Sequence, residues 1–166
     1  MYTLRNLAES VRIRCSLELE RHGSVWPLAV VVHGELCRYA TVRVEAHQKP
    51  ALYEALAEIV QEEKPTALIY CETGLTLVTP EKNRKLLTDS QWAWFLQQGP
   101  EWLLEYGYAK PQECIDVTAQ DSEMFCSLMT PFQRCGKRIV WEEPKWLELP
   151  QSAISPETNL LKFYGR

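Results

Sequence analysis

The residues from Val11 to Glu20, VRIRCSLELE, alternate strictly between apolar and polar side chains. A period of two over ten residues is typical of a β-strand that buries one face and exposes the other. A helix would distribute the same apolar side chains around its whole circumference. The pattern therefore predicts a half-buried strand, whose buried face carries Val11, Ile13, Cys15, Leu17 and Leu19.

Two further strands are expected directly after this one. The run WPLAVVV at residues 26–32 is continuously apolar, which is typical of a strand covered on both faces. The pair His33-Gly34 suits a tight turn because glycine readily adopts positive φ. A β-rich segment from Leu36 to Val44 follows. The opening of the chain is therefore predicted to be a three-stranded antiparallel meander.

The hydrophobic period changes between Pro50 and Glu63. Apolar residues recur there at intervals of three and four, which predicts one buried stripe of a helix. Pro50 suits a first helical turn, and Pro65 prevents the helix from continuing. We expect a strand from Thr66 to Cys71, a turn at Thr73-Gly74 and a second strand from Leu75 to Thr79. The predicted order up to this point is βββαββ.

Residues 88–107 are predicted to form a helical hairpin. Thr88 and Gln91 have the spacing of a capping box, in which each side chain bonds the backbone N–H of the other. Leu87 and Trp92 have the spacing of a hydrophobic staple across the same helix start. Gly99 is expected to end the first helix, and a second one runs from Pro100 to a stop at Gly107.

The whole chain is predicted to be an α+β protein with a mostly antiparallel sheet of five to seven strands. The later strands are Cys114–Ala119, Met124–Met129 and a short one at Arg138–Trp141. One helix packs across one face, and the helical hairpin is an appended element. We expect a single domain over residues 1–150, with the hairpin as an insertion at 88–107 and a C-terminal tail at 151–166. The predicted core contains Val11, Ile13, Leu17, Leu28, Val30, Val32, Leu56, Ile59, Leu68 and Ile69.

Composition excludes several classes of protein. The net charge of −4 argues against a chain that binds nucleic acid on its own. No stretch approaches the roughly 18–20 apolar residues that span a bilayer, and the first ten residues lack the apolar run of a signal peptide. We therefore expect a cytoplasmic protein without a membrane segment. The six cysteines are scattered without a CxxC motif, which favours small buried side chains over disulfides.

The hairpin sequence QWAWFLQQGPEWLLEYGY is unusually aromatic. On a helical wheel, Trp92, Phe95 and Leu96 share one side and Trp94 lies nearly opposite, so one sheet cannot bury both sides. Trp94 is therefore either covered by another segment or exposed as a contact site. The predicted partner-binding residues are Trp94, Trp102, Leu104 and Tyr108, rimmed by Glu101 and Glu105, with Trp141, Trp146 and Phe163–Tyr164 behind them.

No phosphate-loop, dinucleotide, nucleophile-elbow or zinc-protease motif occurs, and the three histidines are widely spread. The leading prediction is therefore a non-enzymatic interaction module, such as an adaptor, an inhibitor or a small subunit of a larger assembly. Its partner is a protein with a basic surface or a second copy of the chain. No cofactor and no metal are expected.

The alternative comes from the predicted element order. Three antiparallel strands, a helix and a fourth strand, over about the first 75 residues, resemble the opening of the ribonuclease-H-like fold. The resemblance implies a metal-dependent phosphodiester enzyme, or a non-catalytic relative of one. The implied metal ligands are Glu20, Glu54 and Glu72, with Asp116 or Asp121 as a fourth.

Overall fold

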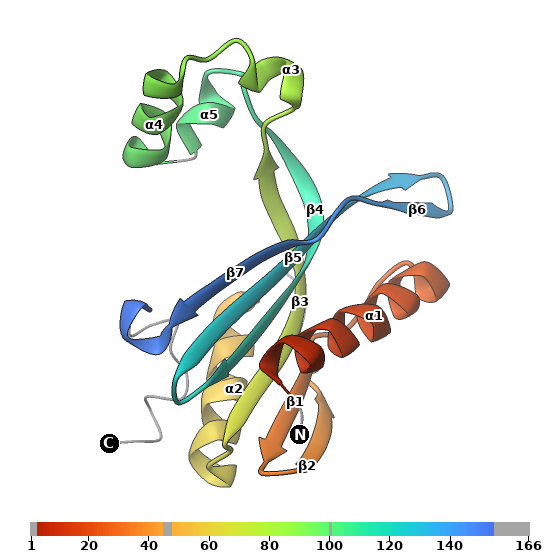
Figure 1. Cartoon of the computed structure of the whole chain (residues 1–166). Coiled ribbons are helices and arrows are strands. Elements are labelled where there is room, and N and C mark those ends of the chain that lie inside the picture. The colour runs from red at the N-terminus through yellow and green to blue at the C-terminus, as the bar shows by residue number, and fades with distance from the viewer. Residues whose placement is uncertain (1–2, 45–47, 100, 155–166) are drawn as a thin grey trace.

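The computed structural model describes residues 3–44, 48–99 and 101–154 (Figure 1). Its centre is an antiparallel sheet of seven strands, in which β2, β1, β3, β4 and β5 lie side by side in that order. On the free side of β5, β7 pairs with its first half and β6 with its end. The α+β prediction and its strand number are confirmed. The strands are β1 (Leu28–His33), β2 (Leu36–Thr41), β3 (Ala67–Val78), β4 (Lys110–Asp121), β5 (Met124–Cys135), β6 (Arg138–Trp141) and β7 (Lys145–Pro150).

The strand predicted over Val11–Glu20 is wrong, because these residues belong to the helix α1 (Leu4–His22). Thr3 caps this helix by accepting the N–H of Asn6 at 3.2 Å, and Gly23 ends it with a φ of 72°. The buried side of the helix carries Leu7, Ala8, Val11, Cys15, Ser16 and Leu19.

This stripe of buried residues begins upstream of the ten alternating residues and keeps the spacing of a helix. The helical period therefore decides the structure, and the period of two does not. Ile13 and Leu17, predicted to lie in the core, are each 47% exposed on the outer side of α1. The predicted meander and the βββαββ order are wrong for the same reason. The observed order begins α1, β1, β2, α2, β3.

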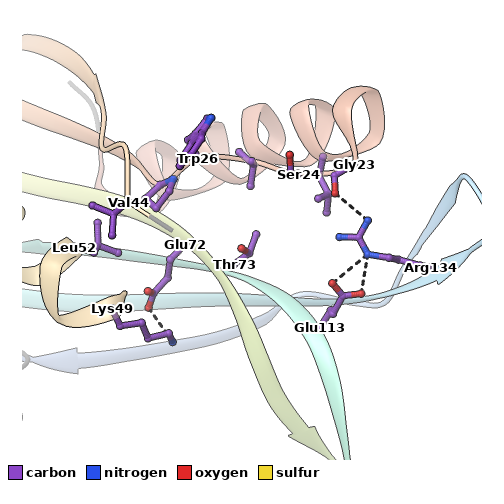
Figure 2. Close-up of a pocket in the computed structure, with 13 residues that line it drawn as sticks. Gly23, Ser24, Trp26, Val44, Lys49, Leu52, Glu72, Thr73, Glu113 and Arg134 are labelled. Atoms are coloured by element: carbon purple, nitrogen blue, oxygen red, sulfur yellow. Dashed lines mark hydrogen bonds and ion pairs between the residues drawn. The ribbon is translucent and has the colours of Figure 1, made fainter. Parts of the chain in front are cut away.

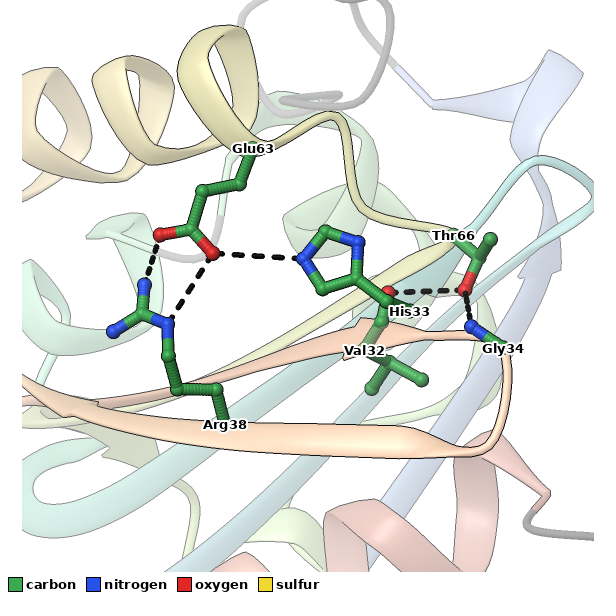
Figure 3. A network of polar contacts seen from close by, with 6 residues as sticks. All are labelled: Val32, His33, Gly34, Arg38, Glu63 and Thr66. Atoms are coloured by element: carbon green, nitrogen blue, oxygen red, sulfur yellow. Dashed lines mark hydrogen bonds and ion pairs between the residues drawn. The ribbon is translucent and has the colours of Figure 1, made fainter.

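The β1–β2 hairpin turns at Gly34, whose φ is 62°, and packs beside the end of α2 (Lys49–Glu63). The Arg38 guanidinium donates hydrogen bonds to both carboxylate oxygens of Glu63, and Nε2 of His33 lies 3.5 Å from the same carboxylate (Figure 3). The bonds from Arg38 lower the pKa of Glu63. On the other side of the turn, Thr66 Oγ1 accepts the N–H of Gly34 and donates to the carbonyl of Val32. These contacts join the hairpin to the chain that leaves α2.

The turn predicted at Thr73-Gly74 does not exist. β3 runs without interruption through 12 residues, and each of them is paired with β4. Gly74 has no positive φ, and a Cβ at this position would lie 3.4 Å from Lys49 Nζ. The glycine therefore marks a close approach of a side chain to the sheet rather than a turn.

Two helices cover the two faces of the sheet. α1 packs over the face that contains Val30, Ile69, Val117, Leu128 and Phe132. α2 packs over the opposite face with Leu52, Leu56 and Val60, against Val31 and Leu68. The prediction that Leu68 and Ile69 are both buried on opposite faces is confirmed. The prediction of one packed helix is corrected to two, and Ile59 is only half-buried.

Between β3 and β4 the chain forms three short helices at the tip of a projecting β-ribbon (Figure 1). We call residues 81–109 the helical cap. It contains α3 (Glu81–Arg84), α4 (Asp89–Gln98) and α5 (Glu101–Glu105). The predicted capping box is confirmed, with Gln91 N–H donating to Thr88 Oγ1 at 3.2 Å and Thr88 N–H donating to Gln91 Oε1 at 2.9 Å. The cap has a small core of its own, formed by Leu87, Phe95, Leu103 and Ala109.

The C-terminal third is more regular than its sequence suggested. β4 and β5 each extend over 12 residues, β6 has the predicted bounds, and β7 was not predicted. A short helix at Gln151–Ala153 begins the predicted tail, and residues 155–166 lie outside the described part. All six cysteines are free thiols, four of them buried. None of the described helices is both long and apolar enough to cross a membrane.

Candidate functional site

Aromatic side chains form a continuous strip on the outside of the helical cap. The ring of Trp94 packs edge-on against Phe95 at 5.1 Å, and Phe95 packs against Tyr106 at 5.7 Å. Tyr106 in turn lies 6.0 Å from the ring of Trp102. Phe95 is buried, whereas Trp94 is 47% exposed and Tyr106 and Trp102 are also exposed. We call Trp94, Tyr106 and Trp102 the aromatic strip.

The other predicted contact residues lie close to this strip or within the cap core. Leu104 is exposed on α5, whereas Tyr108 is half-buried with its ring 5.7 Å from Phe95. Leu96, expected on the core side of α4 with Trp92 and Phe95, is exposed. Tyr106 was not predicted as a contact residue, although its spacing of four residues from Trp102 indicates that both lie on one side of the predicted second helix.

A shallow hollow of about 370 Å³ lies beside Trp94 and is lined by Ser90, Gln91, Trp94, Phe95 and Tyr106. Residues 88–109 contain three acidic side chains and no basic one. Glu101 and Glu105 are exposed on α5. Asp89 is paired with Arg84 at 2.9 Å, and this arginine also lies 4.8 Å above the Trp92 ring. The surface of α4 and α5 is therefore apolar and aromatic with an acidic border, whereas the basic residues of the cap, Lys82, Arg84 and Lys85, lie in and directly after α3.

Trp141 and Trp146 lie apart from the cap. The Trp141 indole donates a 2.6 Å hydrogen bond to Glu20, and Arg5 lies 4.7 Å over the Trp146 ring. Both tryptophans are half-buried against the core on the α1 side of the sheet. Through these contacts the two tryptophans join the β6–β7 segment to α1. Phe163–Tyr164 lies outside the described residues.

The carboxylates of the alternative hypothesis do not converge. Glu20 bonds Trp141 on the α1 side, Glu72 bonds Tyr53 on the α2 side, and Glu54 is exposed on α2. Asp121 accepts two backbone N–H groups in the β4–β5 turn. Across residues 3–44, 48–99 and 101–154, no group of three or more His, Cys, Asp or Glu side chains is placed to hold a metal ion. The first strand on which the resemblance depended is also a helix.

One pair of these carboxylates does come together. Glu72 on β3 lies directly opposite Asp116 on β4, facing α2. Tyr53 donates a 3.2 Å hydrogen bond to Glu72, and Lys49 Nζ lies 3.7 Å from the same carboxylate. Ser127 donates to Asp116 at 3.1 Å. Burial raises the pKa of Glu72 and of Asp116, and Lys49 partly opposes both shifts.

The acid pair predicts a specific dependence of stability on pH. Both carboxyls have folded-state pKa values above their unfolded values, so the folded state binds protons more tightly. This stabilisation is fully present below the unfolded pKa of about 4, and it is lost as pH rises through the folded pKa. Relative to a Glu72→Gln/Asp116→Asn double variant, the free energy of unfolding of the wild type is expected to fall as the pH rises above about 4.

Urea unfolding at a series of pH values measures this difference. A Lys49→Met variant supplies the comparison, because it removes the ammonium group that lowers both pKa values. Its stability is expected to fall more steeply than that of the wild type over the same range. Parallel curves for the wild type and the double variant would contradict the prediction.

A cavity of about 360 Å³ lies next to Glu72, at the start of β1 (Figure 2). Its walls include Trp26, Val44 and Leu52, and Glu72 and Thr73 contribute from β3. At its far side Arg134 pairs with Glu113 at 2.9 Å and donates to the Gly23 carbonyl at 3.0 Å. The sequence alone gives no sign of this cavity, because its lining residues come from segments far apart in the chain.

Comparisons with known proteins found no protein-family model, no curated protein and no solved structure that matches this chain.

Proposed function

We propose that this protein is an interaction module whose helical cap binds a protein partner that presents a basic, partly apolar surface. The observation that carries the proposal is the aromatic strip. Its three side chains are exposed, yet Trp94 and Tyr106 both pack on the buried ring of Phe95, and Trp102 packs on Tyr106. Large exposed aromatic groups held together on one surface are typical of binding sites.

The strip is organised before any partner arrives. Phe95 anchors Trp94 and Tyr106, and the capping box fixes the start of the helix that carries Trp94. Tryptophan and tyrosine have few rotatable bonds, so they contribute a large contact area at a small cost in conformational entropy. An aromatic surface that is organised in advance therefore loses less conformational entropy on binding than a flexible exposed surface would.

Charge indicates the kind of partner. Glu101 and Glu105 are exposed on α5, and the segment 88–109 carries no basic side chain. Acidic residues at the rim of an apolar patch accelerate association with a basic surface and repel an acidic one. A partner with lysine or arginine around an apolar centre is therefore the best match for the cap.

The test compares Trp94→Ala with a matched variant elsewhere. Tyr39 on β2 has nearly the same exposure, 48% against 47%, and lies outside the cap. Partners are first identified by crosslinking and mass spectrometry in native host lysate, and the affinity is then measured with purified proteins. Trp94→Ala is expected to weaken binding by about 30-fold or more, as for a central interface residue. Tyr39→Ala is expected to leave it unchanged.

Circular dichroism confirms that each variant remains folded. Reversing charge with Glu101→Lys and Glu105→Lys is expected to slow association and to reduce its dependence on salt. A partner that binds wild type and Trp94→Ala equally would refute the proposal, as would equal losses in Trp94→Ala and Tyr39→Ala. Sedimentation at increasing concentration tests the second-copy alternative, in which wild type associates and Trp94→Ala remains monomeric.

A further inference from the structure

The second half of β3 has an open edge. β3 is paired with β4 along all 12 of its residues but with β1 along only five, and the β1 ladder ends where Leu28 faces Cys71. Beyond that point, among the described residues, no strand lies beside residues 72–78 on the β1 side. Every second residue of this segment therefore turns its backbone N–H and C=O toward an unoccupied edge.

The cavity beside Glu72 lies where β1 would run if it began a few residues earlier. Residues 24–27, which lead into β1, line the cavity instead of pairing with β3. Figure 2 shows Glu72 and Thr73 on β3 at one side of the hollow, with Trp26 and Val44 across from them. A strand added beside residues 72–78 would therefore meet the cavity next to Glu72 and Thr73, and the open edge of β3 beyond it.

An extended backbone is the occupant that satisfies such an edge. Unpaired strand edges bind other strands through their main-chain hydrogen bonds, and a pocket beside the edge selects a side chain of the incoming peptide. We propose that residues 72–78 of β3 bind an extended peptide segment of a partner protein as an added strand, with one of its side chains in the cavity beside Glu72. This surface is separate from the aromatic strip, and the inference does not depend on the function proposed for the cap.

The charges around the edge indicate the composition of the peptide. On the α2 side, Glu72 and Asp116 provide two carboxylates against the single ammonium of Lys49. On the other side, Glu113 and Arg134 neutralise each other. On that side of the sheet, the apolar cavity walls from Leu19 and Val25 favour an apolar side chain. The complementary peptide therefore alternates apolar and basic residues, so that one face of the strand is basic.

The probe is an acetylated and amidated octapeptide of alternating lysine and valine. Two matched peptides accompany it, one with glutamate in place of lysine and one with two internal valines replaced by proline. Hydrogen exchange of the protein is followed with each peptide up to about 1 mM. At a concentration ten times its Kd, the lysine peptide is expected to slow exchange of the edge-facing amides within residues 72–78 by about tenfold. The glutamate peptide should protect much less, and the proline peptide, which cannot complete a ladder, not at all.

Two leucine variants locate the effect. Leu75 and Leu86 are 72% and 71% exposed, but Leu75 lies on the open edge and Leu86 in the cap. Leu75→Lys is expected to abolish protection, because a lysine blocks a strand edge and repels the basic peptide. Leu86→Lys should bind as the wild type does.

Equal protection by all three peptides, or no protection at about 1 mM peptide, would overturn the inference. Protection confined to residues 89–105 would assign the basic peptide to the cap and overturn the edge site alone. A dimer of the free protein that Leu75→Lys dissociates would show that a second copy occupies the edge.

Discussion

Replacing Phe95 by alanine is expected to open the helical cap while the sheet stays folded. Phe95 is buried at the centre of the cap, where its ring contacts Trp94, Tyr106 and Tyr108 at 5.1, 5.7 and 5.7 Å. Truncating a buried phenylalanine costs about 3–5 kcal/mol. Among the described residues of the cap, its core contains four buried side chains, so it cannot absorb such a loss.

Hydrogen exchange resolves this local effect. In Phe95→Ala, amides of α4 are expected to exchange at rates close to those of an unfolded chain, whereas amides of β1 and β4 keep their protection. Thr88→Ala serves as a milder variant for comparison. It removes only the N-cap hydrogen bond of α4 and is expected to cost about 1 kcal/mol. If the sheet amides lose protection together with α4, the cap and the sheet unfold as one unit and the prediction fails.

Replacing Phe132 by alanine is expected to destabilise the whole sheet. Phe132 is 1% exposed on β5, and its ring lies 5.3 Å from Trp141. The loss of about 3–5 kcal/mol is a large fraction of the 5–15 kcal/mol that stabilises a typical domain. Urea unfolding followed by far-ultraviolet circular dichroism should show a lower midpoint with an unchanged slope.

Val140 on β6 gives the matched control for this experiment. Its side chain is exposed, and exposed positions usually tolerate substitution within about 0.5 kcal/mol. Val140→Ala is therefore expected to unfold at nearly the wild-type midpoint. A loss below about 1 kcal/mol in Phe132→Ala would mean that the ring is not part of the main core.

The α1 segment illustrates why local patterns can mislead. Its ten alternating residues fit a strand, but the pattern that decides the structure begins at Leu7 and repeats every three or four residues to Leu19. Ile13 and Leu17 completed the alternation without being buried. A window that included Thr3 and Leu7 would have revealed both the helix cap and the helical stripe.

Gly74 shows that a glycine does not always indicate a turn. The sequence predicts a turn at Thr73-Gly74, whereas Gly74 lies inside a continuous strand where Lys49 approaches it. Local sequence cannot distinguish these uses, because the approaching side chain comes from 25 residues earlier in the chain, at position 49 against 74. The strand β7 was not predicted because Pro144 directly before it and Pro150 at its end are typical of a loop.

The start of α4 was predicted correctly because its signal is local. The capping box needs only neighbouring residues. Trp94 is exposed, which is one of the two outcomes that the sequence left open, but the helical wheel wrongly placed Leu96 on the core side. Predicting the acid pair requires the register of β3 against β4, and predicting the cavity requires the position at which β1 begins. Such long-range pairings are set by the packing of the whole sheet, which a single sequence does not reveal.

The continuous strand β3 connects features that would otherwise be independent. Its first residues lie in the core, its middle borders the cavity, and Leu77 near its end packs against the cap core. A strand added along residues 72–78 would restrict the bending of the ribbon that carries the cap. Rigidity gained at one site lowers the entropy cost of binding at the other. Thermodynamic linkage requires this cooperativity to be reciprocal, so a cap ligand would tighten peptide binding by the same factor.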